Sequence, residues 1–134
     1  MRFVRNLPWI IGGLFLILHG FAHMPAVFGS WNIATFDDVT RQPNFLLTSA
    51  GDTMIYVLGA VWFFAALSFV IAGIGVLRQS AWWPMMIALA LVLSVPMTVL
   101  WREDAFAGLL INGVLLAAMG VWYLLGIREE RQFA

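Results

Sequence analysis

The sequence alternates between four long apolar stretches and short polar segments. Each stretch is long enough to cross a bilayer, which takes about 20 helical residues. Lipid cannot satisfy exposed backbone polar groups, and the alternation typical of strands is missing, so each stretch is predicted to be a helix. The pattern predicts an all-α integral membrane protein, a four-transmembrane-helix bundle in one domain. The predicted helices cover residues 7–28, 53–77, 81–101 and 105–127, and an outer loop covers residues 29–52.

Composition agrees with this pattern. Hydrophobic residues make up 63% of the 134 residues, charged residues make up 10%, and the mean hydropathy is +0.93. Soluble domains are roughly half apolar and about a quarter charged, so lipid is predicted to be the solvent for much of the chain. The net charge is zero and no basic patch is present, so no nucleic-acid partner is expected. Cysteine is absent, which excludes disulfides and thiolate metal sites.

The arginines predict the orientation, because the side of a membrane protein that is rich in arginine lies in the cytoplasm. The rich side here holds both termini, which are therefore predicted to be cytoplasmic. Most tryptophans lie near the ends of the predicted helices, and Trp62 is the exception because it lies deep within one. The first stretch exceeds the core of a signal peptide, so we expect a retained helix. The rich side holds Arg2, Arg5, Arg78, Arg128 and Arg131, and the other side holds Arg41 and Arg102.

Polar residues inside the predicted helices gather at one depth. Inward faces of membrane bundles carry small and polar residues, whereas lipid-facing surfaces are aliphatic. Counting about 1.5 Å per residue from the helix ends places the polar residues in the outer half of the bundle. This convergence predicts a candidate ligand site, with Arg102 and Asp104 as candidates for the mouth of a cavity. The site residues are His19, His23, Tyr56, Ser94, Thr98 and Asn112.

The two histidines allow two interpretations. His19 and His23 are four residues apart and share a helix face, so they could bind a quinone head group, a haem, a pigment or a metal. Alternatively, each imidazole donates to a backbone carbonyl, such as that of Phe21, which Pro25 leaves without its amide partner. The sequence favours this structural role over metal or haem binding, because no cysteine or embedded carboxylate completes a ligand set.

The other polar residues also have structural interpretations. Asn112 in mid-helix is typical of interhelical hydrogen bonding, and Ser94 and Thr98 can bond to carbonyls of their own helix. Arg102 and Asp104 fit an interfacial turn with a capping acid. No catalytic motif is present and no metal site is predicted, so the sequence does not favour an enzyme.

Small residues predict where helices approach closely. On the second predicted helix Gly59, Ala66 and Gly73 repeat every seven residues and let a neighbouring backbone approach. A second such face is predicted on the last helix, made by Gly113, Ala117 and Gly120.

One group of residues resembles a known family. The segment His19-Gly20-Phe21-Ala22-His23, together with Trp101, Asp104-Ala105, Gly108 and Asn112, resembles small bacterial four-span membrane proteins of the DoxX-like group. The resemblance in topology covers nearly the whole chain. It implies a multi-pass protein of the bacterial cytoplasmic (inner) membrane. The group has been linked to redox and sulfur metabolism, and it has no agreed catalytic residues to carry over.

Three functions are compatible with the sequence. The first is a non-enzymatic accessory subunit that packs against other membrane subunits or against itself, and the sequence favours it. The second is a ligand or redox module near His19 and His23. The third is a small oligomeric transporter, suggested by helix kinks at Pro25 and Pro96, although no embedded acid supports ion coupling.

Overall fold

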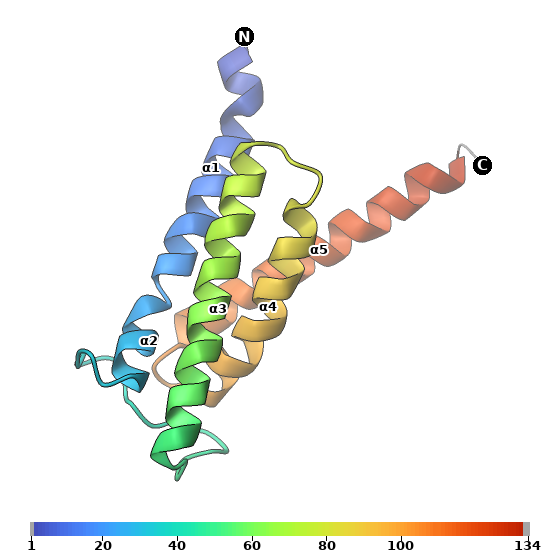
Figure 1. The fold of residues 1–134 in the computed structure, drawn as a ribbon. Coiled ribbons are helices and arrows are strands. Elements are labelled where there is room, and N and C mark those ends of the chain that lie inside the picture. Colours follow the sequence, from blue (N-terminus) through green and yellow to red (C-terminus); the bar gives the residue numbers. More distant parts are fainter. Residues whose placement is uncertain (1, 133–134) are drawn as a thin grey trace.

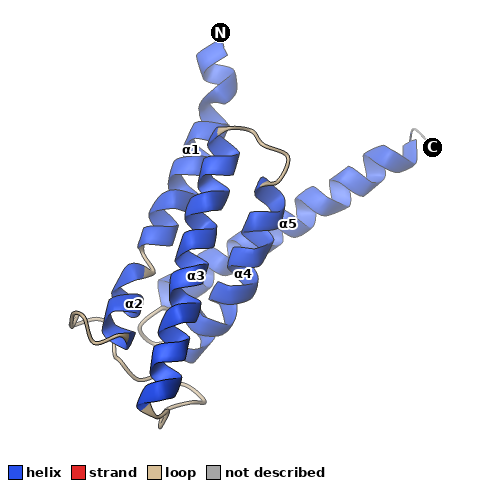
Figure 2. Ribbon diagram, in the orientation of Figure 1, coloured by secondary structure: helices blue, strands red, loops and turns tan. Residues whose placement is uncertain are grey.

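The computed structural model describes residues 2–132, with side chains for residues 6–126. Every element in this part of the chain is a helix (Figure 2). Four segments, Asn6–Ser30, Asp52–Leu77, Trp83–Leu100 and Phe106–Gly126, are long and apolar enough to cross a membrane, which confirms the predicted all-helical class. The helices are α1 (Arg2–Phe21), α2 (Met24–Ser30), α3 (Asp52–Leu77), α4 (Trp83–Leu100) and α5 (Phe106–Gln132).

The first predicted span, 7–28, consists of two helices, and the break between them lies just before Pro25, where a kink was predicted. The chain leaves the α-helical pattern at Ala22 and His23, where the amide of His23 donates to the carbonyl of Gly20 at 3.2 Å. Pro25 has no amide hydrogen, and it lies in the first turn of α2, where a helix tolerates proline because no amide donor is needed. The first residues of α3, α4 and α5 lie within two residues of the predicted starts. The last helix was predicted to end at residue 127, whereas α5 continues to Gln132.

Helices α1 and α3 pack through glycine. A Cβ atom on Gly73 would lie 2.6 Å from the carbonyl oxygen of Gly13, and one on Gly20 would lie 2.7 Å from the carbonyl oxygen of Ala66. A Cβ atom on Gly59 would lie 2.5 Å from Nε1 of Trp31, so glycine at this position leaves room for the indole ring. The predicted close-approach face on the second span is therefore confirmed.

The buried apolar side chains form two clusters, one toward each end of the bundle. We call the end with α2 and the loop after it the loop end, and the opposite end the terminal end (Figure 1). The loop-end cluster contains Val27, Leu58, Trp62, Met97 and Trp101. The terminal-end cluster contains Leu16, Phe69, Ala72, Val76, Ile87, Ala90 and Leu91.

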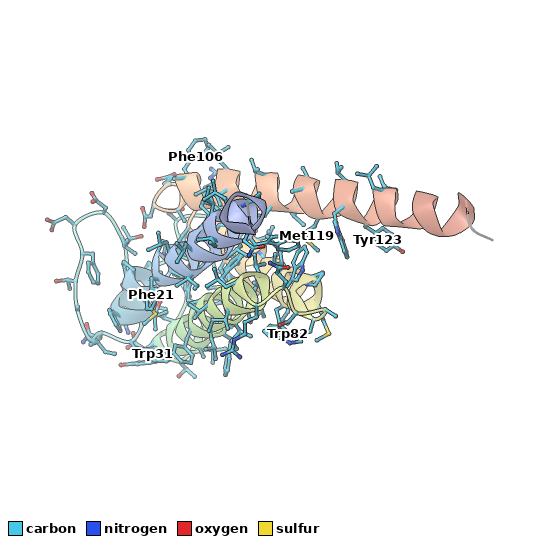
Figure 3. All side chains as sticks on the ribbon, turned by 90° about the horizontal axis from the view of Figure 1, so that it is seen from above. Phe21, Trp31, Trp82, Phe106, Met119 and Tyr123 are labelled. Atoms are coloured by element: carbon cyan, nitrogen blue, oxygen red, sulfur yellow. The ribbon has the colours of Figure 1, made fainter. Side chains whose placement is uncertain are left out.

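Helix α5 packs against α4 and inclines away from the other helices (Figure 1). Viewed from above, it continues past them toward Tyr123 (Figure 3). Leu115 and Met119 touch the terminal-end cluster, whereas a Cβ atom on Gly113 or Gly120 would meet nothing within 4 Å. Within the described chain, nothing therefore approaches Gly113 or Gly120 of the close-approach face predicted at Gly113, Ala117 and Gly120. Small residues permit a close approach but supply no attraction, and here larger side chains on the other face make the contact.

Candidate functional site

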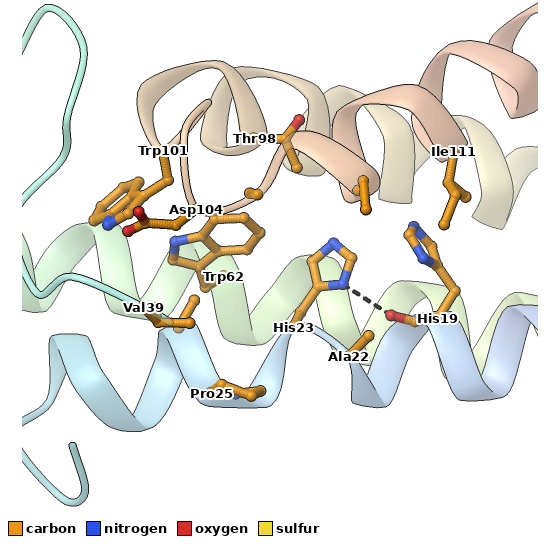
Figure 4. Close-up of a pocket in the computed structure, with 14 residues that line it drawn as sticks. His19, Ala22, His23, Pro25, Val39, Trp62, Thr98, Trp101, Asp104 and Ile111 are labelled. Atoms are coloured by element: carbon orange, nitrogen blue, oxygen red, sulfur yellow. Dashed lines mark hydrogen bonds between the residues drawn. The ribbon is translucent and has the colours of Figure 1, made fainter. Parts of the chain in front are cut away.

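A cavity of about 260 Å³ lies at the loop end and is lined by residues of α1, α2, α3, α4 and the beginning of α5 (Figure 4). Its wall is mostly apolar, with His19, His23, Thr98 and Asp104 as polar members. Small-molecule sites of proteins typically measure about 300–1,000 Å³ and combine apolar walls with a few polar groups. The cavity is slightly smaller than this range and has the same character.

Five polar side chains form one hydrogen-bonded network beside the cavity, which we call the polar network; four lie on α1, α4 and α5, and His23 lies in the turn between α1 and α2. Its members are buried, with between 0% and 6% of their surface exposed. Nε2 of His19 lies 3.1 Å from Oδ1 of Asn112, and Nε2 of His23 lies 2.7 Å from Oγ of Ser94. Nδ2 of Asn112 donates to Ser94 at 2.8 Å and to Thr98 at 3.4 Å. The network thereby joins α1, α4 and α5.

The geometry fixes the direction of each bond. Nδ1 of His23 lies 2.8 Å from the carbonyl oxygen of His19, which can only accept, so Nδ1 carries a hydrogen. No carboxylate among the described side chains contacts His23, and an unpaired buried charge is costly, so the ring is neutral and Nε2 accepts the hydrogen of Ser94. Ser94 and Thr98 both accept from Asn112 Nδ2, which leaves Asn112 Oδ1 to accept from His19 Nε2.

This assignment leaves one free acceptor. With hydrogen on Nε2, a neutral His19 keeps a lone pair on Nδ1, for which the described residues provide no donor. His19 is part of the cavity wall. A hydroxyl or amide hydrogen of a ligand could therefore bind there.

Trp62 supplies the complementary donor. Among the described side chains, Arg41 Nε and Trp62 Nε1 are buried without a hydrogen-bond partner. Arg41 bonds through Nη1 to Asp52, whereas the indole N–H is the only polar group of Trp62. Trp62 is 3% exposed and lies in the cavity wall between His23 and Trp101 (Figure 4). An unpaired buried N–H costs about 1–3 kcal/mol. Trp62 lines the cavity, so a ligand acceptor that reached Nε1 would relieve this cost.

Aromatic rings hold these polar groups in place. The rings of His23 and Trp62 meet edge to face with centroids 5.1 Å apart, and those of Trp62 and Trp101 do so at 5.9 Å. His19 packs edge to face on Phe69 at 4.7 Å. Such contacts add about 0.5–1.5 kcal/mol beyond area burial, so they fix the orientation of the rings.

The loop after α2 closes one end of the cavity through a set of bonds that we call the clasp. The amide and the hydroxyl of Thr40 donate to Oδ2 of Asp104 at 2.7 and 2.6 Å. The indole N–H of Trp101 donates to the carbonyl oxygen of Thr40 at 2.8 Å, and Asn44 donates to Oδ1 of Asp104 at 3.2 Å. Val39, next to Thr40, forms part of the cavity wall.

No family model, curated protein or solved structure matches the chain.

The structure brings together most of the predicted site residues. His19, His23, Ser94, Thr98 and Asn112 all belong to the polar network. The structural interpretation of the histidines named the wrong acceptor, because His23 bonds to the carbonyl of His19 and not to that of Phe21. The peptide amide of His23 turns to Gly20, which frees the carbonyl of His19 for the side chain.

The remaining predicted residues lie elsewhere. Tyr56 is 47% exposed and lies outside the cavity wall. Arg102 is exposed, with its guanidinium carbon 4.1 Å from the centre of the Phe45 ring. Asp104 does lie at the end of the cavity, but it bonds to the loop and does not cap α5.

Two features were missed by reasoning from the sequence. Trp62 lines the cavity, and the signal for it was its depth, far from the interfaces that tryptophan prefers. The clasp at Thr40 had no signal, because loop residues follow no periodicity. Within residues 6–126, no group of three or more His, Asp or Glu side chains is placed to hold a metal ion.

Proposed function

We propose that the protein is a membrane-embedded binding module for a small, uncharged organic molecule. The observation that carries the proposal is the indole N–H of Trp62, buried and without a partner in the wall of an apolar cavity. A ligand carbonyl or ether oxygen would accept from it. The free lone pair on Nδ1 of His19 would accept from a ligand hydroxyl.

The chemistry of the site narrows the ligand. Both nitrogens of His23 are used within the polar network, so of the two imidazoles only His19 keeps a free nitrogen. This favours an organic ring over a haem with two histidine ligands or a metal ion, which needs several donors. The volume of about 260 Å³ favours a ring of the size of a quinone head group over a large pigment.

Native mass spectrometry after gentle extraction from the source membrane tests this function. We expect the wild-type protein to carry an added small mass, and Trp62→Phe to lose most of it because the variant keeps the ring but lacks the N–H. The matched control is Trp122→Phe, since Trp122 packs on Trp83 outside the cavity. A wild-type protein without added mass, whose cavity also fails to bind uncharged ring compounds, would contradict the proposal.

The orientation and the membrane are part of the proposal. The excess of arginine near the termini and near Arg78 supports cytoplasmic termini, which places the cavity toward the outer face. The resemblance to DoxX-like proteins supports the bacterial inner membrane.

The surface of α5 favours a second candidate function, an accessory role in a larger membrane assembly. Val114, Leu116 and Val121 are each about half exposed or more. Among the closely packed helix pairs, α5 takes part in one, its pair with α4. Another subunit or a second copy would cover this surface. Native mass spectrometry would then show added protein subunits, whereas a monomer would contradict this role.

A further inference from the structure

The cavity is not fully enclosed, and four of its lining residues, Ala22, Ala26, Ala107 and Ile111, lie along α2 with the turn before it and along the beginning of α5. We call the gap between these two helices, with these four residues as its rim, the portal. Ala22 and Ala107 line the cavity and are also exposed on the outside of the helices. Helices α2 and α5 are not among the closely packed pairs, which are α1–α3, α2–α3, α3–α4 and α4–α5.

Hydrogen bonds and helix contacts border the other sides of the cavity. The clasp between Thr40 and Asp104 covers the loop end. The polar network and the terminal-end cluster fill the opposite end. Helix α3 packs against both α2 and α4 and closes the back.

We infer that the ligand is a membrane-dissolved amphiphile, whose uncharged head group occupies the cavity and whose alkyl tail extends through the portal into the bilayer. The inference rests on the proposed function and adds the class of ligand and its route. Small side chains on the rim leave room for a chain of methylene groups. The surrounding lipid would solvate the rest of the tail, so a long tail costs no burial inside the protein.

Two esters with one head group test this directly. Methyl and dodecyl 4-hydroxybenzoate share an ester carbonyl for Trp62 and a hydroxyl for His19, and they differ only in the tail. The full-length protein is placed in lipid nanodiscs, and the bound fraction of each ester is measured by native mass spectrometry at a fixed ester-to-lipid ratio. Each variant is compared with wild type for the same ester, so the partitioning of the ester into lipid cancels.

The decisive variant is Ala107→Trp, which fills the rim of the portal. Its matched control is Val114→Trp, two turns along the same helix, 69% exposed and outside the cavity wall. We expect Ala107→Trp to weaken binding of the dodecyl ester at least about tenfold more than it weakens binding of the methyl ester, because the methyl ester has no tail to pass the portal. Val114→Trp should change neither. Ala22→Trp, on the opposite rim, should repeat the effect of Ala107→Trp.

The outcomes separate this inference from the proposed function. If wild type binds the methyl ester and rejects the dodecyl ester, or if both portal variants bind the dodecyl ester as wild type does, the portal is overturned and the binding module stands. If binding of both esters is absent, or is the same in Trp62→Phe as in wild type, the assignment of the head-group site fails and the portal fails with it.

Discussion

The terminal end and the loop end of this bundle are held together by different contacts. At the terminal end, Gly13 and Gly73 bring α1 and α3 close enough for backbone contact, and aliphatic side chains fill the remaining space. At the loop end, polar side chains bond across helices beside a cavity lined by Trp62, whose N–H has no partner among the described residues. In lipid, close packing stabilises helix pairs, whereas embedded polar groups tend to serve function. The comparison places close packing mainly at one end and the proposed binding site at the other.

The largest effect on stability is expected at the terminal end, for Gly73→Ala. The new methyl group would lie 2.6 Å from the carbonyl oxygen of Gly13, so α1 and α3 must separate. We expect a loss of about 1–3 kcal/mol in the free energy of unfolding, measured by denaturation in mixed detergent micelles. Gly120→Ala is the matched control, because its methyl group meets nothing within 4 Å and alanine favours helix. Equal stability of the two variants would contradict the assigned helix pair.

The next effect is expected for Asn112→Ala, which removes the amide that joins α5 to α1 and α4. The change leaves Nε2 of His19 without an acceptor and removes a donor to Ser94. Interhelical hydrogen bonds in membranes are worth about 0.6–1.7 kcal/mol each, so we expect a loss of about 1–2 kcal/mol in the same assay. The control is Val114→Ala on the exposed part of α5. A variant as stable as the control would show that the polar network does not hold α5.

A smaller effect should distinguish two hydroxyl groups. Ser94 bonds to both His23 and Asn112, at 2.7 and 2.8 Å, whereas Thr98 meets Asn112 at 3.4 Å. Ser94→Ala should therefore lower the free energy of unfolding by about 0.5–1 kcal/mol, and Thr98→Val should lower it by less. The reverse order would contradict the assignment of the stronger bonds to Ser94.

The smallest effect on global stability is expected for Asp104→Asn, because the clasp lies near the surface. The carboxylate of Asp104 accepts from Thr40 on one oxygen and from Asn44 on the other, whereas an asparagine has only one side-chain oxygen that can accept. The variant therefore loses one of the two sets of bonds, and the loop should open more often. We expect several-fold faster hydrogen exchange at the amide of Thr40, with unchanged exchange in α3. Asp38→Asn, in the same loop and exposed, is the control. Unchanged exchange at Thr40 would show that the clasp does not hold the loop.

The sequence predicted those features that follow from helical periodicity and depth. His19, Ser94 and Asn112 meet because their helices bring them to one level, which the rise per residue sufficed to show. The close approach at Gly73 followed from the repeat of small residues.

Features that depend on the angle between helices could not be predicted in this way. Gly113 and Gly120 carry the same pattern as Gly59 and Gly73, but the inclination of α5 turns them away from any neighbour. Whether the N–H of Trp62 has a hydrogen-bond partner depends on the side chains around it, which the local sequence does not specify. The bond between Thr40 and Asp104 joins residues that are 64 positions apart, so it has no local sequence signal either.

The most direct measurement is the indole ¹⁵N–¹H resonance of Trp62 in ¹⁵N-labelled protein in nanodiscs, identified by its loss in Trp62→Phe. If this N–H is the donor of the binding site, adding methyl 4-hydroxybenzoate will move the resonance downfield, as expected for a new hydrogen bond, and will slow its exchange with water. A resonance that stays unchanged while the ester is in excess would contradict a ligand site at Trp62.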